Sequence, residues 1–264
     1  MGSLLKFRGP NMLDGDAWHS AEVDYILSHG RHTPTDRILD VGCGRGGRVR
    51  AFAAHGFGNV TGLDATASNV EAAQNLTRKM GLHAAFVEGD PFHYPFVEQV
   101  FDEILILSDL FGHGSSPRGD TELLREAHRA LRPGGTLWLS VADGEWIRRH
   151  VEADMVEPLP NGFIARRRTL SCEGFRLTTR TVVADEKRGI ATDQVLTEWL
   201  YGPSDLTEIL YSLGFRAVSY RAHEPGFTAT PRGAPNIPPR YLVRCRAPYP
   251  VVNSELHVVT ANGR

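Results

Sequence analysis

The 264-residue sequence predicts an α/β fold, in which a doubly wound sheet of seven strands ends in an antiparallel closing hairpin and carries an inserted antiparallel β cap. Three observations lead to this prediction. Short apolar runs alternate with helical stretches through the first half of the chain. A glycine-rich turn joins the first apolar run to a helix. Between residues 143 and 201 the pattern changes to long segments punctuated by glycines.

The first strand and the turn after it organise the rest of the chain. Residues 38–41 read Ile-Leu-Asp-Val, which suits a buried parallel strand. Gly42, Gly44 and Gly46 follow, and a helical stretch over 48–55 comes next. Glycines let the backbone bend tightly and let a ligand lie against it, and a helix N-terminus offers free N–H groups. The order of strand, glycine turn and helix predicts the first half of a Rossmann-like nucleotide site.

Three carboxylates are expected at neighbouring strand ends. Asp40 lies inside the end of the first strand, Asp64 ends a second strand over 59–63, and Asp90 follows a third over 83–88. The carboxyl ends of parallel strands share one edge of the sheet, where ligands bind. Asp64 can accept hydrogen bonds from ribose hydroxyls and Asp90 from an adenine amino group. The glycines also satisfy the dinucleotide fingerprint, so an NAD-dependent oxidoreductase stays an alternative.

The order of these motifs resembles the class I S-adenosylmethionine-dependent methyltransferases. The pattern consists of Asp-x-Gly-x-Gly-x-Gly over 40–46, then Asp64, then Gly-Asp over 89–90. Residues 131–137, Leu-Arg-Pro-Gly-Gly-Thr-Leu, resemble the turn into the fifth strand of that family. The spacing agrees from about residue 37 to 141 and more loosely to 247.

The resemblance implies S-adenosyl-L-methionine (SAM) as the cofactor and S-adenosyl-L-homocysteine as its product. The glycines would hold the methionine end, Asp64 the ribose and Asp90 the adenine edge. Asp40 would order the loop and the methionine amine. The predicted cofactor-binding residues are Asp40, Gly42, Cys43, Gly44, Gly46, Asp64, Ala65, Gly89, Asp90, Pro91 and Ser108.

The acceptor side is expected in the loop after a fourth strand over 101–107. Phe-Gly-His over 111–113 resembles a segment of small-molecule methyltransferases, including some sugar N-methyltransferases, and the Asn/Asp-Pro-Pro-Tyr of DNA and glutamine methyltransferases is absent from this place. His113 is the predicted catalytic residue, a base or an orienting group, because histidine titrates near neutrality; a plain surface histidine is the alternative. The predicted acceptor-binding residues are Trp18, Tyr94, Phe111, Trp146 and Arg148.

Helical periodicity predicts the remaining helices. A helix over 16–28, capped by Asp16, would cover the cofactor in the resembling family. A helix that ends near 80 is expected to begin near Thr66 or Ser68: Ser68 with Glu71 fits a capping box, and Thr66 is the alternative cap. Asp120 is expected to cap a helix that ends at Leu131. Two shorter helices are predicted over 144–151 and from 203 to 213.

The second half of the chain reads mainly as β structure. Three antiparallel strands are predicted over 163–170, 175–184 and 190–200, and a closing hairpin over 215–220 and 240–246. The predicted division is therefore a SAM-binding domain made of 1–142 and 202–247, with a lid helix inside 1–36, an acceptor cap over 143–201 and a tail over 248–264.

The amino-acid composition narrows the classes of partner that the protein is expected to bind. A net charge of −2 disfavours a nucleic-acid substrate. Three widely spaced cysteines fit a reducing cytoplasm and show no metal-ligand spacing, so no metal is predicted. No apolar run approaches ~20 residues, so no membrane span is predicted. The expected partner is a small-molecule acceptor, and a homo-oligomer formed through the cap or the tail stays open.

The leading functional prediction is methyl transfer from SAM to a nitrogen or oxygen atom of a small molecule, in specialised metabolism. The alternatives are C-methylation or a non-methylating reaction with bound SAM, an NAD-dependent oxidoreductase, and a non-catalytic SAM-sensing or scaffold protein.

Overall fold

The computed structural model describes residues 15–108, 110–114, 116–185, 189–222 and 240–249. The predicted tail falls almost wholly outside this part of the chain, as does the first part of the predicted lid. The side chain of Asp16, predicted as a helix cap, is also outside it.

The main sheet has seven strands in the order β10-β11-β5-β4-β1-β2-β3. Strands β1 to β5 run parallel, and β11 runs antiparallel to both β5 and β10. The doubly wound sheet and its closing hairpin are therefore confirmed. The strands are β1 (Arg37–Val41), β2 (Asn59–Asp64), β3 (Ala85–Glu88), β4 (Phe101–Ile106), β5 (Leu131–Ala142), β10 (Arg216–Ala222) and β11 (Arg240–Arg246).

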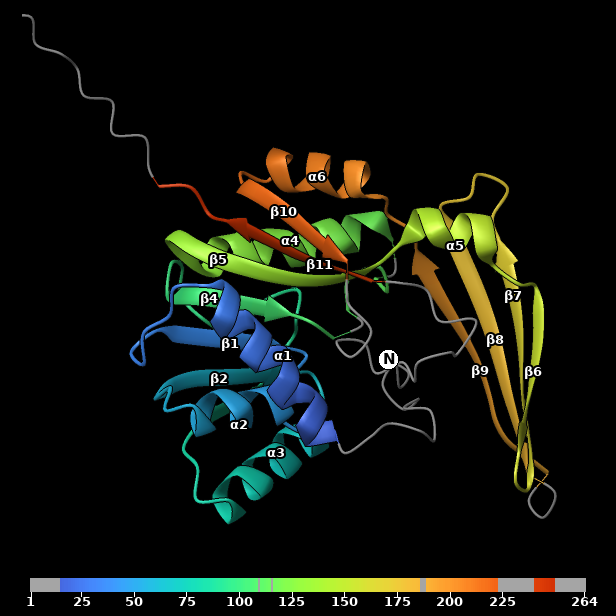
Figure 1. Ribbon diagram of the computed structural model, residues 1–264, viewed down its shortest axis with the longest axis horizontal. Coiled ribbons are helices and arrows are strands. Elements are labelled where there is room, and N and C mark those ends of the chain that lie inside the picture. Colours follow the sequence, from blue (N-terminus) through green and yellow to red (C-terminus); the bar gives the residue numbers. More distant parts are fainter. Residues whose placement is uncertain (1–14, 109, 115, 186–188, 223–239, 250–264) are drawn as a thin grey trace, which may run out of the picture.

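Helices cover both faces of this sheet (Figure 1). Alternation along the strands divides the core in two: Ile38 and Leu105 pack with the face under α1, α2 and α3, whereas Leu39, Ile104 and Ile106 pack with the face under α4 and α6. Both faces are dry, which is why these central strands read as nearly continuous apolar runs. The helices are α1 (Gly15–His29), α2 (Gly47–Ala54), α3 (Ala67–Lys79), α4 (Pro117–Ala130), α5 (Gly144–His150) and α6 (Pro203–Ser212).

A second, antiparallel sheet stands beside the main one (Figure 1). Its order is β6-β7-β8-β9, with β6 (Asp154–Leu159), β7 (Gly162–Leu170), β8 (Arg176–Asp185) and β9 (Gly189–Trp199). The prediction of three strands was wrong by one. The missed strand β6 contains Pro158 and lacks clean alternation, and both features are tolerated because β6 lies at the sheet edge.

One helix start agrees with a predicted alternative and another differs from the prediction. Helix α3 begins after Thr66, the alternative cap, so Ser68 lies inside the helix. Helix α4 begins at Pro117, and its N-cap Ser116 accepts a hydrogen bond from the amide of Gly119 at 3.4 Å. Asp120, expected as the cap, is instead buried in the first turn of α4, where it serves a neighbouring loop.

Candidate functional site

Two of the three glycines in the turn are closely packed, and the third is open. Gly42, Gly44 and Gly46 have φ values of 70°, 54° and 78°, in the left-handed region that favours glycine. A Cβ on Gly42 would lie 2.5 Å from Ser108 Oγ, and one on Gly46 would lie 2.6 Å from the Phe86 ring. A Cβ on Gly44 would meet no atom of the described residues within 4 Å. Gly44 therefore presents bare backbone to a space where a ligand can lie.

Asp64 fixes the turn from the end of β2. Its Oδ2 accepts a hydrogen bond from the amide of Gly44 at 2.8 Å. Its Oδ1 accepts from the Thr66 amide and from Asn69 Nδ2, both at 3.0 Å. Asp64 is buried and Ala65 after it is exposed. The carboxylate thus joins the two strand ends at which the cofactor was predicted, although its predicted contact with ribose stays a prediction.

The third strand end is more open. Asp90 Oδ1 accepts a hydrogen bond from the amide of Phe92 at 2.8 Å, while its side chain is 58% exposed. The neighbours of this carboxylate are packed: Gly89 would meet Leu63 and Pro95 if it carried a Cβ, and Pro91 is buried. Asp90 therefore stands on a rigid corner with its Oδ2 facing solvent near His93, and it can accept a hydrogen bond from a ligand.

Asp40 belongs to a buried ion cluster that sequence reasoning missed. Arg48 Nη1 donates to Asp40 Oδ1 at 3.3 Å, and Arg48 Nε donates to Glu22 Oε2 at 2.7 Å. Burial, partly offset by Arg48, raises the pKa of Asp40 to about 6. Asp40 Oδ2 is buried and has no hydrogen-bond partner in the described part of the chain. The only hint in the sequence is a charged residue in the first turn after the glycines.

Cys43 lies in the core, and its thiol is not reactive. Its side chain is buried next to Gly62 and Phe86. Burial and the nearby carboxylates Asp40 and Asp64 raise the pKa of the Cys43 thiol, so the thiol stays protonated. Cys43 contributes its backbone to the turn, with its amide donating to Leu63 O at 3.0 Å.

The loop after β4 is bonded to residues far away in the sequence. Asp120 Oδ1 accepts from the amides of Gly112 at 3.0 Å and Gly114 at 3.2 Å. Asp120 Oδ2 accepts from the Tyr201 hydroxyl at 2.8 Å. Trp199, the last residue of β9, donates its amide to Gly112 O at 2.6 Å and its indole N–H to Gly114 O at 3.2 Å. Helix α4 and the second sheet thus hold both glycines that flank the predicted catalytic histidine.

His113 faces the second sheet. Its Nε2 lies 3.9 Å from Glu198 Oε2, and its side chain is 12% exposed. Its Nδ1 is buried and has no hydrogen-bond partner among the residues that the structure describes. A proton on Nε2, next to the carboxylate, would leave the Nδ1 lone pair as the basic atom. At the start of the same loop, Ser108 Oγ donates to Val41 O at 3.1 Å, so Ser108 ties the ends of β1 and β4 together.

The structure places the predicted acceptor-binding residues in packed surroundings. Tyr94 and Phe111 are in the core, and burial raises the pKa of the Tyr94 phenol. Trp146 stacks on a histidine of its own helix at 4.7 Å. Arg148 donates to Leu200 O at 3.3 Å. Trp18 hydrogen-bonds Glu22, which puts it beside the buried ion cluster. Their predicted contacts with an acceptor stay predictions.

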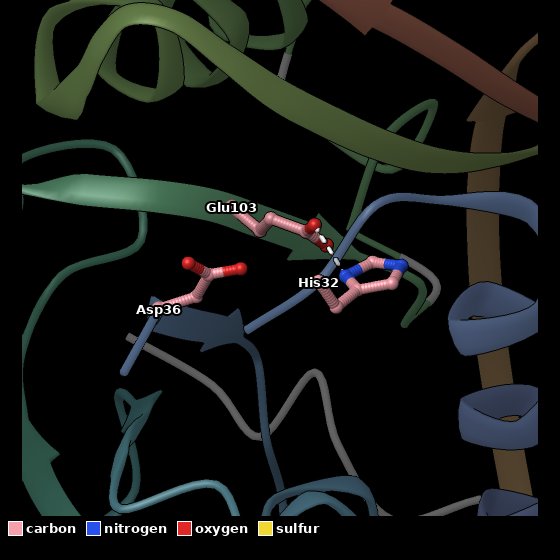
Figure 2. Close-up of side chains that lie close together, drawn as sticks. All are labelled: His32, Asp36 and Glu103. Carbon is pink, nitrogen blue, oxygen red and sulfur yellow. Dashed lines mark ion pairs between the residues drawn. The ribbon is translucent and has the colours of Figure 1, made fainter. Parts of the chain in front are cut away.

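A second polar cluster lies at the amino ends of the strands, away from the glycine turn (Figure 2). His32 Nδ1 lies 2.7 Å from Glu103 Oε1, and His32 Nε2 lies 2.9 Å from Ile26 O. Trp138 Nε1 donates to Glu103 Oε2 at 3.1 Å. Asp36, the third member, accepts from the amide and hydroxyl of Thr33. Each group has a protein partner, so this cluster anchors the C-terminal end of α1 to β4.

The reversed strand β11, the glycine turn after β1 and the acids at the strand ends define a class I methyltransferase fold. Residues 38–135 match the family of the methyltransferase domain. This match, together with the fold, confirms the predicted resemblance to the class I SAM-dependent methyltransferases, and SAM is the cofactor of that class. No helix in the described ranges is long and apolar enough to cross a membrane.

Solved structures share this fold over nearly the whole chain. A SAM-dependent methyltransferase from Clostridium acetobutylicum superposes with a TM-score of 0.68 at 13% identity, covering 89% of this chain and 93% of its own. The CcbJ methyltransferase from Streptomyces caelestis gives a TM-score of 0.68 at 15% identity, covering 92% and 94%.

Curated relatives match over a shorter stretch. Sterol 24-C-methyltransferase from Pneumocystis carinii is 31% identical over 125 residues, or 47% of this chain and 31% of the relative. Methyltransferase GfsG from Streptomyces halstedii is 32% identical over 109 residues, or 40% of this chain and 37% of the relative. The chain thus spans about a third of the length of the curated relatives it matches.

Proposed function

We propose that this chain transfers the methyl group of SAM to a nitrogen or oxygen atom of a small-molecule acceptor. The observation that carries the proposal is the open face of Gly44, whose amide donates to the buried carboxylate of Asp64. Asp40, four residues earlier in the chain, has a buried carboxylate oxygen without a hydrogen-bond partner in the described ranges. Bare backbone suits the methionine chain of SAM, and an unpartnered carboxylate oxygen suits its ammonium.

Methyl transfer of this kind needs little more than alignment and a place for one proton. SAM supplies a methyl group already activated by its sulfonium. The acceptor's lone pair forms the new bond to carbon as the carbon–sulfur bond breaks and its electron pair stays on sulfur. His113 Nδ1 is the atom we assign to the departing N–H or O–H proton, with Glu198 near Nε2. The fixed loop around His113 keeps that nitrogen in one place.

The test has two stages. S-adenosylhomocysteine should raise the thermal midpoint of the protein and NAD should not, because a ligand that binds only the folded state stabilises it. Incubation with SAM and a panel of amines and alcohols should then give a product heavier by one methylene, and His113→Ala should slow its formation. Stabilisation by NAD alone would favour the oxidoreductase.

A second candidate is C-methylation, because the first curated relatives are a sterol 24-C-methyltransferase, a 24-methylenesterol C-methyltransferase and a cycloartenol-C-24-methyltransferase. The sequence match to them covers 38–47% of this chain in these three cases, so more than half of the chain is unmatched. A product whose new methyl is bonded to carbon would decide for this candidate.

The setting is part of the proposal. We assign the protein to the cytoplasm, since Cys43, Cys172 and Cys245 are free thiols and Cys172 is exposed. A role in specialised metabolism has a parallel in a structural neighbour described as an amino pentose methyltransferase involved in calicheamicin biosynthesis. If the protein forms a homo-oligomer through the second sheet, light scattering will give a molar mass that is a multiple of the chain mass.

A further inference from the structure

The buried ion cluster connects the first helix to the cofactor edge. Glu22 comes from α1, Arg48 from α2 and Asp40 from β1. Their side chains are 5%, 8% and 0% exposed. Burying a charged side chain costs free energy unless the charge is paired. Three buried charged side chains in one cluster therefore need a physical explanation beyond packing.

The guanidinium of Arg48 is divided between two carboxylates. Its Nε is committed to Glu22 at 2.7 Å, and only Nη1 reaches Asp40, at 3.3 Å. An arginine commonly binds a carboxylate through two parallel hydrogen bonds. Here Asp40 receives one, and its Oδ2 is left buried without a hydrogen-bond partner in the ranges described.

The charges of the cluster do not balance. Two carboxylates and one guanidinium leave a formal excess of one negative charge, and Asp64 lies close enough to add to it. Arg240 acts on Glu22 from the other side, but it also bonds to Ser140. One ligand cation placed at Asp40 Oδ2 would satisfy both the missing hydrogen bond and the missing charge.

We propose that Glu22 is a positioning residue for cofactor binding, which keeps the buried Asp40 Oδ2 without a protein partner among the described residues, so that it can pair with the ammonium of the methionine end, by holding Arg48 to one side. The inference rests on the proposed function, since it takes SAM as the ligand. Without the Glu22 carboxylate, the guanidinium is free to bind both oxygens of Asp40 and to neutralise the group that receives the ligand. Docking of α1 and binding of the ammonium are thereby coupled through Arg48.

Two ligands separate this role from a general effect on folding. S-adenosylhomocysteine carries the ammonium, and 5′-methylthioadenosine shares its adenosine and sulfur but lacks the amino-acid end. By calorimetry, Glu22→Gln should weaken S-adenosylhomocysteine binding by at least about fivefold and leave 5′-methylthioadenosine binding unchanged. Asp24→Asn is the matched control: Asp24 is on the same helix and pairs with His55 of the α2 C-cap at 2.9 Å, but its side chain is 63% exposed. This variant should bind both ligands as the parent does.

The double variant shows whether Glu22 acts through Asp40. Asp40→Asn should reproduce the selective loss, and adding Glu22→Gln to it should cause no further loss, because the two residues work on one oxygen. If Glu22→Gln does not fold, Arg48→Lys supplies a second test, because a lysine ammonium lacks the planar fork with which the guanidinium holds Glu22 and Asp40 through separate nitrogens; it should give the same selective loss.

Three results would overturn the inference. Equal loss of both ligands in Glu22→Gln would mean a structural role only, and unchanged S-adenosylhomocysteine binding would mean no role. If the parent protein binds neither ligand, the proposed function fails together with this inference; if it binds both and Glu22→Gln is silent, the inference fails alone.

Discussion

The two halves of the site are held together in different ways. The cofactor half is local: Asp64 bonds to Gly44, Thr66 and Asn69, all close along the chain or on the adjoining strand. The proposed acceptor half is assembled from distant parts of the chain, since Asp120 in α4 bonds to Tyr201, which lies 81 residues later, after β9. Local contacts leave a signature in short motifs, and distant contacts do not. Sequence reasoning therefore finds the first half and misses most of the second.

The largest effect should come from breaking the cofactor half at Gly46. Gly46→Ala combines a positive φ with a Cβ 2.6 Å from the Phe86 ring, and it should lower the free energy of unfolding by about 2–5 kcal/mol. Gly44→Ala is the comparison, because its Cβ meets no atom in the described part of the chain and only the backbone strain of about 1–2 kcal/mol applies. Urea unfolding measures both.

Gly44→Ala should nevertheless lose S-adenosylhomocysteine binding, because its methyl occupies the open space. A Gly44→Ala protein that binds the ligand normally would contradict the placement of the cofactor on this face.

The next largest effect is expected in the acceptor half of the site, from a substitution at Tyr201. Tyr201→Phe removes the hydroxyl that bonds to Asp120 and loosens the loop around His113, so the single-turnover rate of methyl transfer should fall by about tenfold to a hundredfold. Binding of S-adenosylhomocysteine should stay unchanged. Tyr220→Phe is matched, since it loses bonds to Thr207 and Pro203 on the far flank, and it should transfer methyl groups at the parent rate.

The pH dependence of cofactor binding sharpens the comparison further. The pKa of Asp40 is about 6 because burial outweighs Arg48, so the free site holds a proton below that pH, and a bound ammonium favours its release. The affinity for S-adenosylhomocysteine should rise by up to about tenfold per pH unit near pH 6. Calorimetry from pH 5 to 7 measures it.

Three other groups face Asp40 and titrate or carry charge: Arg48, Glu22 and Asp64. Burial also raises the pKa of Glu22, so Asp40→Asn is the control that assigns the effect, and its profile should be flatter. For stability the sign is opposite. The folded chain holds a proton that the unfolded chain loses between the ordinary pKa of 3.8 and about 6, so ionised Asp40 disfavours folding as the pH rises through that window.

The smallest effect should come from the anchor at the amino ends of the strands, which belongs to neither half. Burial lowers the pKa of His32, but the hydrogen bond and charge of Glu103 outweigh it, and the net direction is upward from 6.5. The stabilisation is therefore complete below pH 6.5 and is lost as the pH rises through the folded value. Glu103→Gln should lower the free energy of unfolding at pH 6 by about 1 kcal/mol, measured with urea.

Glu122→Gln, which breaks an exposed pair with Arg118, should change the free energy of unfolding by less than about 0.5 kcal/mol. Neither variant should alter ligand affinity, and a loss of affinity in Glu103→Gln would show that this anchor communicates with the cofactor edge.

The extent of sequence prediction follows the same division. The order of glycines and acids predicted the sheet, the turn and the cofactor edge, because each motif is a few residues long and has a backbone reason. Asp120 was misassigned as a helix cap, since its position near a helix start says nothing of Gly112 or Tyr201. Glu22 escaped notice because an acid on a helix is normally solvated, and only the folded chain brings Arg48 to it.

The bonds from Trp199 to the two glycines have a consequence for engineering. A designer who replaces residues 154–198 with a foreign module, in order to change which molecules are methylated, would keep the native Trp199 and Tyr201 at the splice. A graft that ends one residue later would replace Trp199 and remove its hydrogen bonds to Gly112 O and Gly114 O, which hold the loop around His113. The position at which such a replacement should end is therefore decided by the carbonyl oxygens of Gly112 and Gly114, which accept from Trp199, and not by the edge of the second sheet.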